Sequence, residues 1–77
     1  MEQKPNFPKL NRIPEVLENQ DFSQRRLAKQ LGISSIAVNN LCTQRSQPSL
    51  ARLFQIAEIL GVSAVDLINV DYKPEKE

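Results

Sequence analysis

The sequence predicts an all-α protein, a compact bundle of five short helices in a single small domain. Three observations lead to this prediction. Apolar residues recur at the spacing of one helix face in successive short runs. A serine precedes four of these runs, where its hydroxyl can accept a hydrogen bond from a free backbone N–H. Both glycines of the chain, Gly32 and Gly61, follow a run, where a residue in the left-handed region commonly ends a helix.

The first helix is expected at residues 12–19, with Ile13, Val16 and Leu17 on its inner face. Pro14 must lie in the first turn, where its missing N–H is not needed, so the helix is short and can begin at Pro14 itself. Residues 1–10 contain two prolines and no helical period. We expect them to form an extended or disordered N-terminal arm.

Two further helices are expected at residues 24–31 and 35–42, with a turn at Gly32 between them. Ser23 and Ser34 are their expected N-caps. The apolar residues of their inner faces are Leu27, Ala28, Leu31, Ala37, Val38 and Leu41.

A fourth helix is expected at residues 49–60, with Ser49 as its N-cap. Ile56 and Ile59 lie off its regular stripe, so they are expected to pack on the fifth helix or, as the less favoured alternative, on a second copy of the protein. The stripe expected to face the core consists of Leu50, Leu53, Phe54, Ala57 and Leu60.

The fifth helix is expected at residues 63–68, where Ser63 and Asp66 have the spacing of a capping box. Apolar and polar residues then alternate over 68–72, which indicates a short extended segment that pairs with the N-terminal arm or across a dimer. Residues 71–77 are expected to be a disordered tail, which leaves residues 11–70 as the folded domain.

The charges are distributed unevenly along the chain. No acidic residue occurs between residues 22 and 57, and the acidic residues lie on both sides of this span. A surface that faces phosphate is commonly built in this way. A charged helix face can also be merely solvated, but the lack of any acid in the span favours a phosphate-facing surface. The basic residues of the span are Arg25, Arg26, Lys29, Arg45 and Arg52.

The composition excludes several classes of site. The chain has no histidine and one cysteine, Cys42, so neither an internal disulfide nor a zinc site is expected. Cys42 is expected to be a small, half-buried residue without a redox role. Without a glycine-rich phosphate loop or an HExxH pattern, we expect no enzyme and no cofactor. No apolar run approaches about 18 residues and no signal sequence is visible, so we expect a cytoplasmic protein without membrane contact.

The spacing of Ala28, Gly32 and Val38 is typical of two helices that cross steeply over a short turn. Such a crossing needs a small residue at the contact, no Cβ at the turn and an apolar residue where the second helix meets the first. Residues 23–68 moreover resemble the helix-turn-helix domain of the Xre/Cro/C1 repressor family. The matching stretches are SQRRLAKQLGIS, QPSLARLFQIAEILGVS and the closing DLI. This resemblance implies a lambda repressor-like DNA-binding domain, whose recognition helix is here at about 35–42 and lies in the major groove.

The chain departs from the family after this recognition helix. The family often has Asn-Gly near Thr43 and Gln44, and this chain has no glycine there. Either the turn avoids the left-handed region or Gln44 is strained.

The residues that would read bases are those that face outward if Val38 and Leu41 face inward. Asparagine can pair with adenine in the major groove, serine can serve several bases, and an exposed isoleucine can contact the thymine methyl. The alternatives are that Ile36 packs beside the preceding helix or loop and that the asparagines are ordinary surface, although asparagine is a poor helix former. By geometry and by resemblance, the base-reading residues are Ser35, Ile36, Asn39 and Asn40.

Phosphate contacts are expected on both sides of the recognition helix. The start of the helix at 24–31 matches the phosphate-contact point of the family, and a helix N-terminus suits phosphate through its free N–H groups. These contacts give affinity and register, whereas base contacts give sequence choice. The expected phosphate-contacting residues are Ser23, Gln24, Arg25, Ser34, Arg45 and Arg52.

Together these features predict a sequence-specific, repressor-like transcription regulator that binds double-stranded DNA, as a homodimer on a two-fold operator. The alternatives are an antitoxin-like or adaptor module that binds protein, and a controller protein of a restriction–modification system. The basic, acid-free recognition surface argues against the protein-binding module. The sequence leaves open the operator, the dimer surface, the genomic context and the choice between repression and activation.

Overall fold

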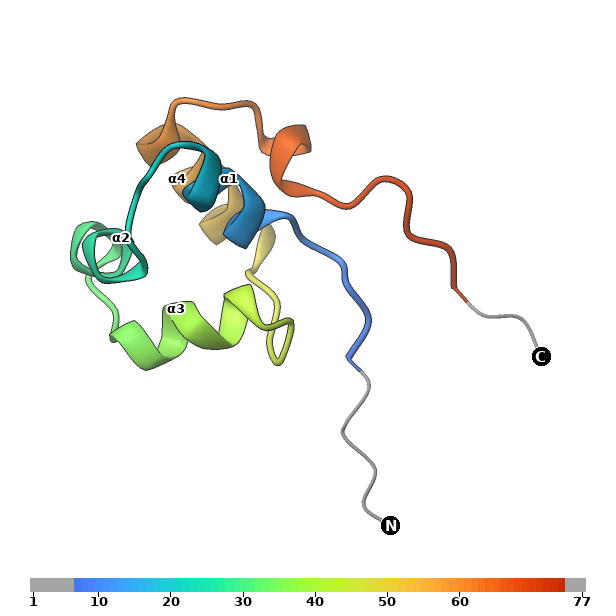
Figure 1. Cartoon of the computed structure of the whole chain (residues 1–77), viewed down its shortest axis with the longest axis horizontal. Coiled ribbons are helices and arrows are strands. Elements are labelled where there is room, and N and C mark those ends of the chain that lie inside the picture. Colours follow the sequence, from blue (N-terminus) through green and yellow to red (C-terminus); the bar gives the residue numbers. More distant parts are fainter. Residues whose placement is uncertain (1–6, 75–77) are drawn as a thin grey trace, which may run out of the picture.

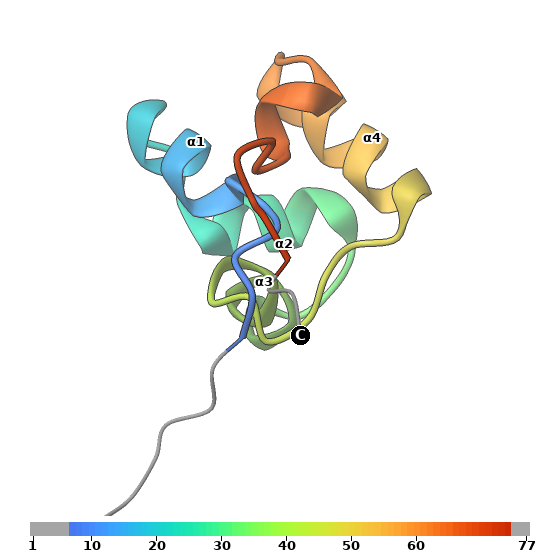
Figure 2. The same cartoon turned by 90° about the vertical axis from the view of Figure 1, so that its right-hand side faces the viewer.

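The computed structural model describes residues 7–74, which form four α-helices followed by one 3-10 helix. The all-α prediction is therefore confirmed, although the fifth element is a single 3-10 turn. Figures 1 and 2 both show α3 on the opposite side of the bundle from α1 and α4. Residues 1–6 of the predicted arm and 75–77 of the predicted tail lie outside the described residues. The elements are α1 (Ile13–Asn19), α2 (Gln24–Leu31), α3 (Ser35–Cys42), α4 (Leu50–Leu60) and η1 (Ala64–Leu67).

The helix ends follow the predicted capping residues. The side chains of Ser23, Ser34 and Ser49 each accept a hydrogen bond, 3.0 Å long, from the backbone N–H three residues further on. Gly32 and Gly61 end α2 and α4 with φ values of 71° and 68°, which a residue without Cβ adopts at little cost. Local sequence is therefore sufficient to define where these helices begin and end.

The first helix begins one residue later than expected. Arg12 is the N-cap of α1 and its side chain makes no capping hydrogen bond. Pro14 lies in the first turn, as expected from its missing N–H. Ile13 and Leu17 are buried in the core, while Val16 packs against it as a partly buried residue.

One predicted helix face is wrong. Leu50 and Phe54 of α4 were expected in the core, but 70% and 60% of their surface is exposed. Ile56, expected off the stripe, is completely buried. The inner face begins at Leu53 and follows the i, i+3, i+4 and i+7 positions of a helix. The first turn of α4 therefore contributes no residue to the core. The buried residues of α4 are Leu53, Ile56, Ala57 and Leu60.

The segments before α1 and after η1 lie side by side at residues 10–12 and 67–69. Asn11 and Ile68 form an isolated antiparallel bridge, with the N–H of Arg12 donating to the carbonyl of Leu67 at 2.8 Å. The N–H of Asn69 donates to the carbonyl of Leu10 at 2.9 Å. Of the two pairings considered for residues 68–72, the one with the N-terminal segment is therefore present within the chain, but only at Ile68. The extended segment expected over 68–72 is wrong beyond Asn69, because residues 70 and 71 form a turn that the N–H of Tyr72 closes by donating to the carbonyl of Asn69 at 3.1 Å.

No helix within residues 7–74 has both the length and the apolar character that crossing a membrane requires.

Candidate nucleic-acid interface

Helix α3 presents one face to the core and the opposite face to solvent. Val38 and Leu41 are buried, whereas Ile36 is 74% exposed and Asn40 is half-buried. Ser34 orients the first turn by accepting the N–H of Ala37. The expected base-reading residues are thus all accessible, and the alternative that Ile36 packs beside the preceding helix or loop is excluded. The exposed members of this set are Ser35, Ile36 and Asn39.

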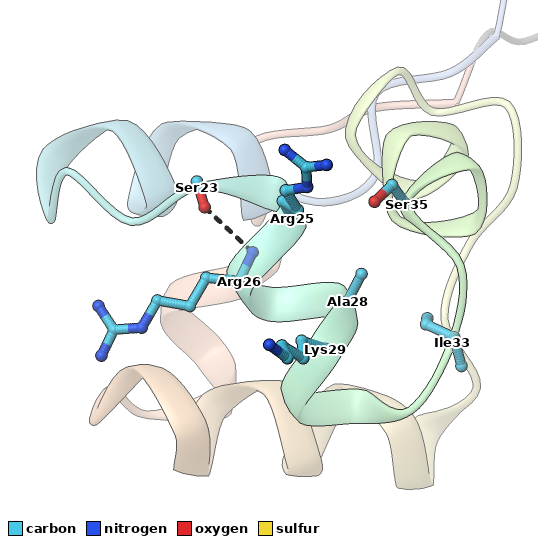
Figure 3. A pocket seen from close by; sticks show the side chains of 7 residues that line it. All are labelled: Ser23, Arg25, Arg26, Ala28, Lys29, Ile33 and Ser35. Atoms are coloured by element: carbon cyan, nitrogen blue, oxygen red, sulfur yellow. Dashed lines mark hydrogen bonds between the residues drawn. The ribbon is translucent and has the colours of Figure 1, made fainter.

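One side of α3 borders a basic hollow, which we call the α2 hollow. Its volume is about 530 Å³, and it lies between α2 and the start of α3 (Figure 3). Figure 3 shows Arg25 and Arg26 pointing away from each other, and the Arg26 guanidinium lies 4.3 Å from the centre of the Phe22 ring. The hollow thus joins the predicted phosphate-contacting end of α2 to the first turn of α3. Its lining residues are Ser23, Arg25, Arg26, Ala28, Lys29, Ile33 and Ser35.

The other side of α3 borders a second depression of about 290 Å³, the α4 groove. Asn40 reaches it from α3, and Arg52 reaches it from the first turn of α4. The Arg52 guanidinium also donates to Gln55 Oε1 at 3.1 Å, which orients it along α4. A candidate base contact and a candidate phosphate contact therefore line the same groove. The groove is completed by Ile33, Ala37, Leu41, Ser46, Gln47, Pro48 and Ser49.

The basic residues around α3 are not neutralised by acids of the described chain. The ion pairs within residues 7–74 are Lys9–Glu15, at 2.7 Å, and Arg12–Asp71, at 3.0 Å. Both pairs lie outside the basic span, so none of its five cations is paired with an acid of residues 7–74. Of the predicted phosphate-contacting set, Arg25 and Ser23 line the α2 hollow and Arg52 lines the α4 groove. Gln24 is half-buried at the first position of α2.

Arg45 lies apart from both depressions, in the loop after α3. Its guanidinium is 5.4 Å from the centre of the Phe7 ring, within the range of a cation–π contact. The residue before it, Gln44, has a φ of 69°. Of the two possibilities expected for this turn, the left-handed one is therefore the one that occurs.

Cys42 is a buried residue at the end of α3. Burial, and secondarily the negative charge of Glu15, raises the pKa of its thiol to about 11. The thiolate is the reactive form, so the surroundings of Cys42 favour an unreactive thiol.

Two features of this surface were not predicted. Arg26 and Lys29 line the α2 hollow, although they were expected only as members of the basic span and not among the phosphate-contacting residues. Asn11 is only 2% exposed and bonds to Gln44 and Gln47, which lie more than thirty residues away. The missing glycine at Gln44 is the one sequence signal that this turn needs support from elsewhere.

Comparisons with known proteins agree with this geometry. Residues 5–67 match the family described as helix-turn-helix. Among solved structures, the chain is similar to the crystal structure of a candidate DNA-binding protein from Bacteroides fragilis. The two chains are 43% identical with a TM-score of 0.77, and the match covers 78% of this chain and 97% of that chain. No curated protein matches.

The fold and the exposed α3 define a helix-turn-helix protein. The match over most of the chain makes the assignment more specific: this protein belongs to the helix-turn-helix family of the Xre/lambda repressor-like type. It is accordingly a DNA-binding helix-turn-helix protein.

Proposed function

We propose that this protein is a sequence-specific, repressor-like transcription regulator that inserts α3 into the major groove of double-stranded DNA. One observation carries the proposal: an exposed helix face lies between two open depressions, the α2 hollow with three cations and the α4 groove with Arg52, and none of these cations has an acidic partner in the described chain. In this arrangement Ser35, Ile36, Asn39 and Asn40 read base edges. The phosphates are contacted by Ser23, Gln24, Arg25, Ser34, Arg45 and Arg52.

The regulator acts as a homodimer on a two-fold operator. A single α3 covers only a few base pairs, and a dimer doubles the contacted sequence with half-sites about 34 Å apart. The exposed side chains of Leu50 and Phe54, one turn apart on α4, support an apolar contact with a second copy. We place the protein in the cytoplasm, where its DNA target would be accessible.

The experiment that tests this function is selection of bound duplexes from a random DNA pool at near-physiological salt, followed by sequencing. We expect enrichment of a two-fold site with half-sites one helical turn apart. An unpaired short site would retain DNA reading and contradict the dimer. Salt-sensitive background binding without enrichment would contradict the specific regulator and favour a protein-binding module.

A further inference from the structure

The loop that follows α3, residues 43–47, is held by the segment that precedes α1, residues 7–12, which we call the N-terminal segment. Gln44 Oε1 accepts hydrogen bonds from the backbone N–H groups of Leu10, at 3.0 Å, and Asn11, at 3.2 Å. Gln44 Nε2 donates to the carbonyl of Asn11 at 3.0 Å. Because these partners are backbone donors and a backbone acceptor, only one orientation of the Gln44 amide satisfies them.

Asn11 extends these contacts to the end of α3. Its Nδ2 donates to the carbonyl of Leu41 at 2.9 Å and to Gln47 Oε1 at 2.8 Å, and its Oδ1 accepts from Gln44 Nε2 at 3.3 Å. Gln47 Nε2 in turn donates to Gln44 Oε1 at 3.0 Å. We call Asn11, Gln44 and Gln47 the amide network. Since Leu41 belongs to α3, the network joins the N-terminal segment to both the loop and the recognition helix.

The backbone at Gln44 depends on this network. A φ of 69° brings the Cβ of an ordinary residue close to its own backbone, which is unfavourable without compensating contacts. Glycine would adopt this conformation freely, but Gln44 adopts it while its side chain makes the hydrogen bonds of the network. The loop conformation is therefore determined by contacts distant in sequence rather than by the local residue type.

The same N-terminal segment contacts Arg45 directly. The Phe7 ring lies under the Arg45 guanidinium, so the residue next to Gln44 is oriented by the segment that holds Gln44. The other cations of this segment within the described residues are already paired, Lys9 with Glu15 at 2.7 Å and Arg12 with Asp71 at 3.0 Å. Arg45 is therefore the cation that this part of the molecule can direct toward a phosphate.

The N-terminal segment is itself anchored from its other side. Asn69 donates from its backbone N–H to the carbonyl of Leu10 at 2.9 Å and from Nδ2 to the carbonyl of Lys9 at 2.7 Å. Its Oδ1 accepts from Arg12 at 2.9 Å. In Figure 2 the N-terminal segment (blue) and the C-terminal segment (red) both pass in front of α3. The segment thus lies between a C-terminal anchor and the loop that carries Arg45.

We propose that Gln44 is a positioning residue of the DNA interface, which holds residues 43–47 so that Arg45 reaches a backbone phosphate beside the bases contacted by α3. Gln44 acts through Arg45 and does not contact DNA itself. The inference rests on the proposed function, because it requires α3 to lie on DNA. It adds to that function a residue that contributes to DNA affinity without touching the DNA.

The test compares Gln44→Asn with Arg45→Ala in a double-mutant cycle of DNA affinity. Asparagine tolerates the left-handed region, but its side chain is too short to reach Leu10 and Asn11. We expect each variant to weaken binding by about three- to tenfold at low salt and to reduce the salt slope by about 1. The double variant should bind no more weakly than Arg45→Ala alone, because Gln44 acts through Arg45. Gln44→Gly, which removes the side chain and relieves the backbone, should behave in the same way if Gln44→Asn folds poorly.

A matched control and a readout without DNA complete the test. Gln30→Asn, at an exposed glutamine of α2, should bind as the parent does. The amide protons of Leu10 and Asn11 should be protected from hydrogen exchange in the parent and lose protection in Gln44→Asn. A purely structural role would lower the unfolding temperature and leave the salt slope unchanged, which would overturn the inference, as would additive effects of the two substitutions.

The two proposals can fail separately. If the parent enriches a specific site and Asn40→Ala weakens it while Gln44→Asn and Gln44→Gly bind as the parent does, the inference alone fails. If the parent shows no DNA binding, the proposed function fails, and the positioning role fails with it.

Discussion

Asn40 of α3 and Arg52 of α4 line the same groove, although twelve positions separate them in the sequence. The turn at residues 43–48 brings the start of α4 back beside α3, so that an amide and a guanidinium share one surface. The first can read a base edge and the second can contact a phosphate. Substituting each should therefore give a different binding phenotype.

We expect Asn40→Ala to weaken binding to the selected site by about 1–3 kcal/mol and to relax the preference at one base pair. Arg52→Ala should instead weaken binding to all sequences similarly and reduce the salt slope by about 1. The measurement is the affinity of each variant for the selected duplex and for its single-base variants over a range of salt concentrations. Asn19→Ala, at the exposed end of α1, is the control. If Asn40→Ala binds every duplex as the parent does, α3 is not the reading element.

The buried face of α4 predicts that substitutions at two apolar residues of this helix differ in their effect on stability. Ile56 is completely buried, so Ile56→Val should lower the free energy of unfolding by about 0.5–1.5 kcal/mol. Phe54 is 60% exposed, so Phe54→Leu should change the free energy of unfolding of the monomer by less than about 0.5 kcal/mol. Urea unfolding followed by circular dichroism, at a concentration where the protein is monomeric, measures both. A larger cost at Phe54 than at Ile56 would contradict the α4 orientation described above.

The exposed face of α4 also predicts the effect of a charge on assembly. Phe54→Glu should shift the protein from dimer to monomer, because a carboxylate in an apolar contact loses its hydration without gaining a partner. Sedimentation at several concentrations measures the shift. Ile36→Ser removes an even more exposed apolar residue from α3 and should leave the dimer intact while altering DNA preference. Equal dimerisation of Phe54→Glu and the parent would exclude this face as the interface.

The ion pair between Lys9 and Glu15 predicts a small pH dependence of stability. The hydrogen bond from Lys9 lowers the pKa of Glu15 below its ordinary value of 4.5. A carboxylate with a lowered pKa stabilises the folded state above its ordinary pKa, and this contribution is lost as the pH falls through the lowered value. Because the pair is about half exposed, we expect at most about 0.5 kcal/mol. Urea unfolding of the parent and of Glu15→Gln should differ near neutral pH and converge below the lowered pKa. A difference that persists there would implicate packing of the side chain rather than its charge.

The sequence predicts the parts of the fold that depend on short-range interactions. Ser23, Ser34 and Ser49 bond to backbone N–H groups three residues away, so the helix starts follow from the residues present. Gly32 and Gly61 adopt the left-handed conformation at helix ends because they have no Cβ. The outward orientation of Ile36 follows from the helical period once Val38 and Leu41 are placed inward. The roles assigned to the site residues and the limits of the folded domain, 11–70, stay predictions.

The tertiary structure decides what local pattern leaves ambiguous. Two apolar stripes overlap on α4, and its packing against α2 and η1 buries Ile56 while it exposes Leu50 and Phe54. Asn11 and Gln44 are partners across thirty-three positions, and their side-chain hydrogen bonds hold a left-handed turn that lacks glycine. Sequence alone determined the helices and their ends, because these depend on neighbouring residues. The rotation of α4 and the position of the Arg45 loop depend on contacts that exist only once distant segments have packed together.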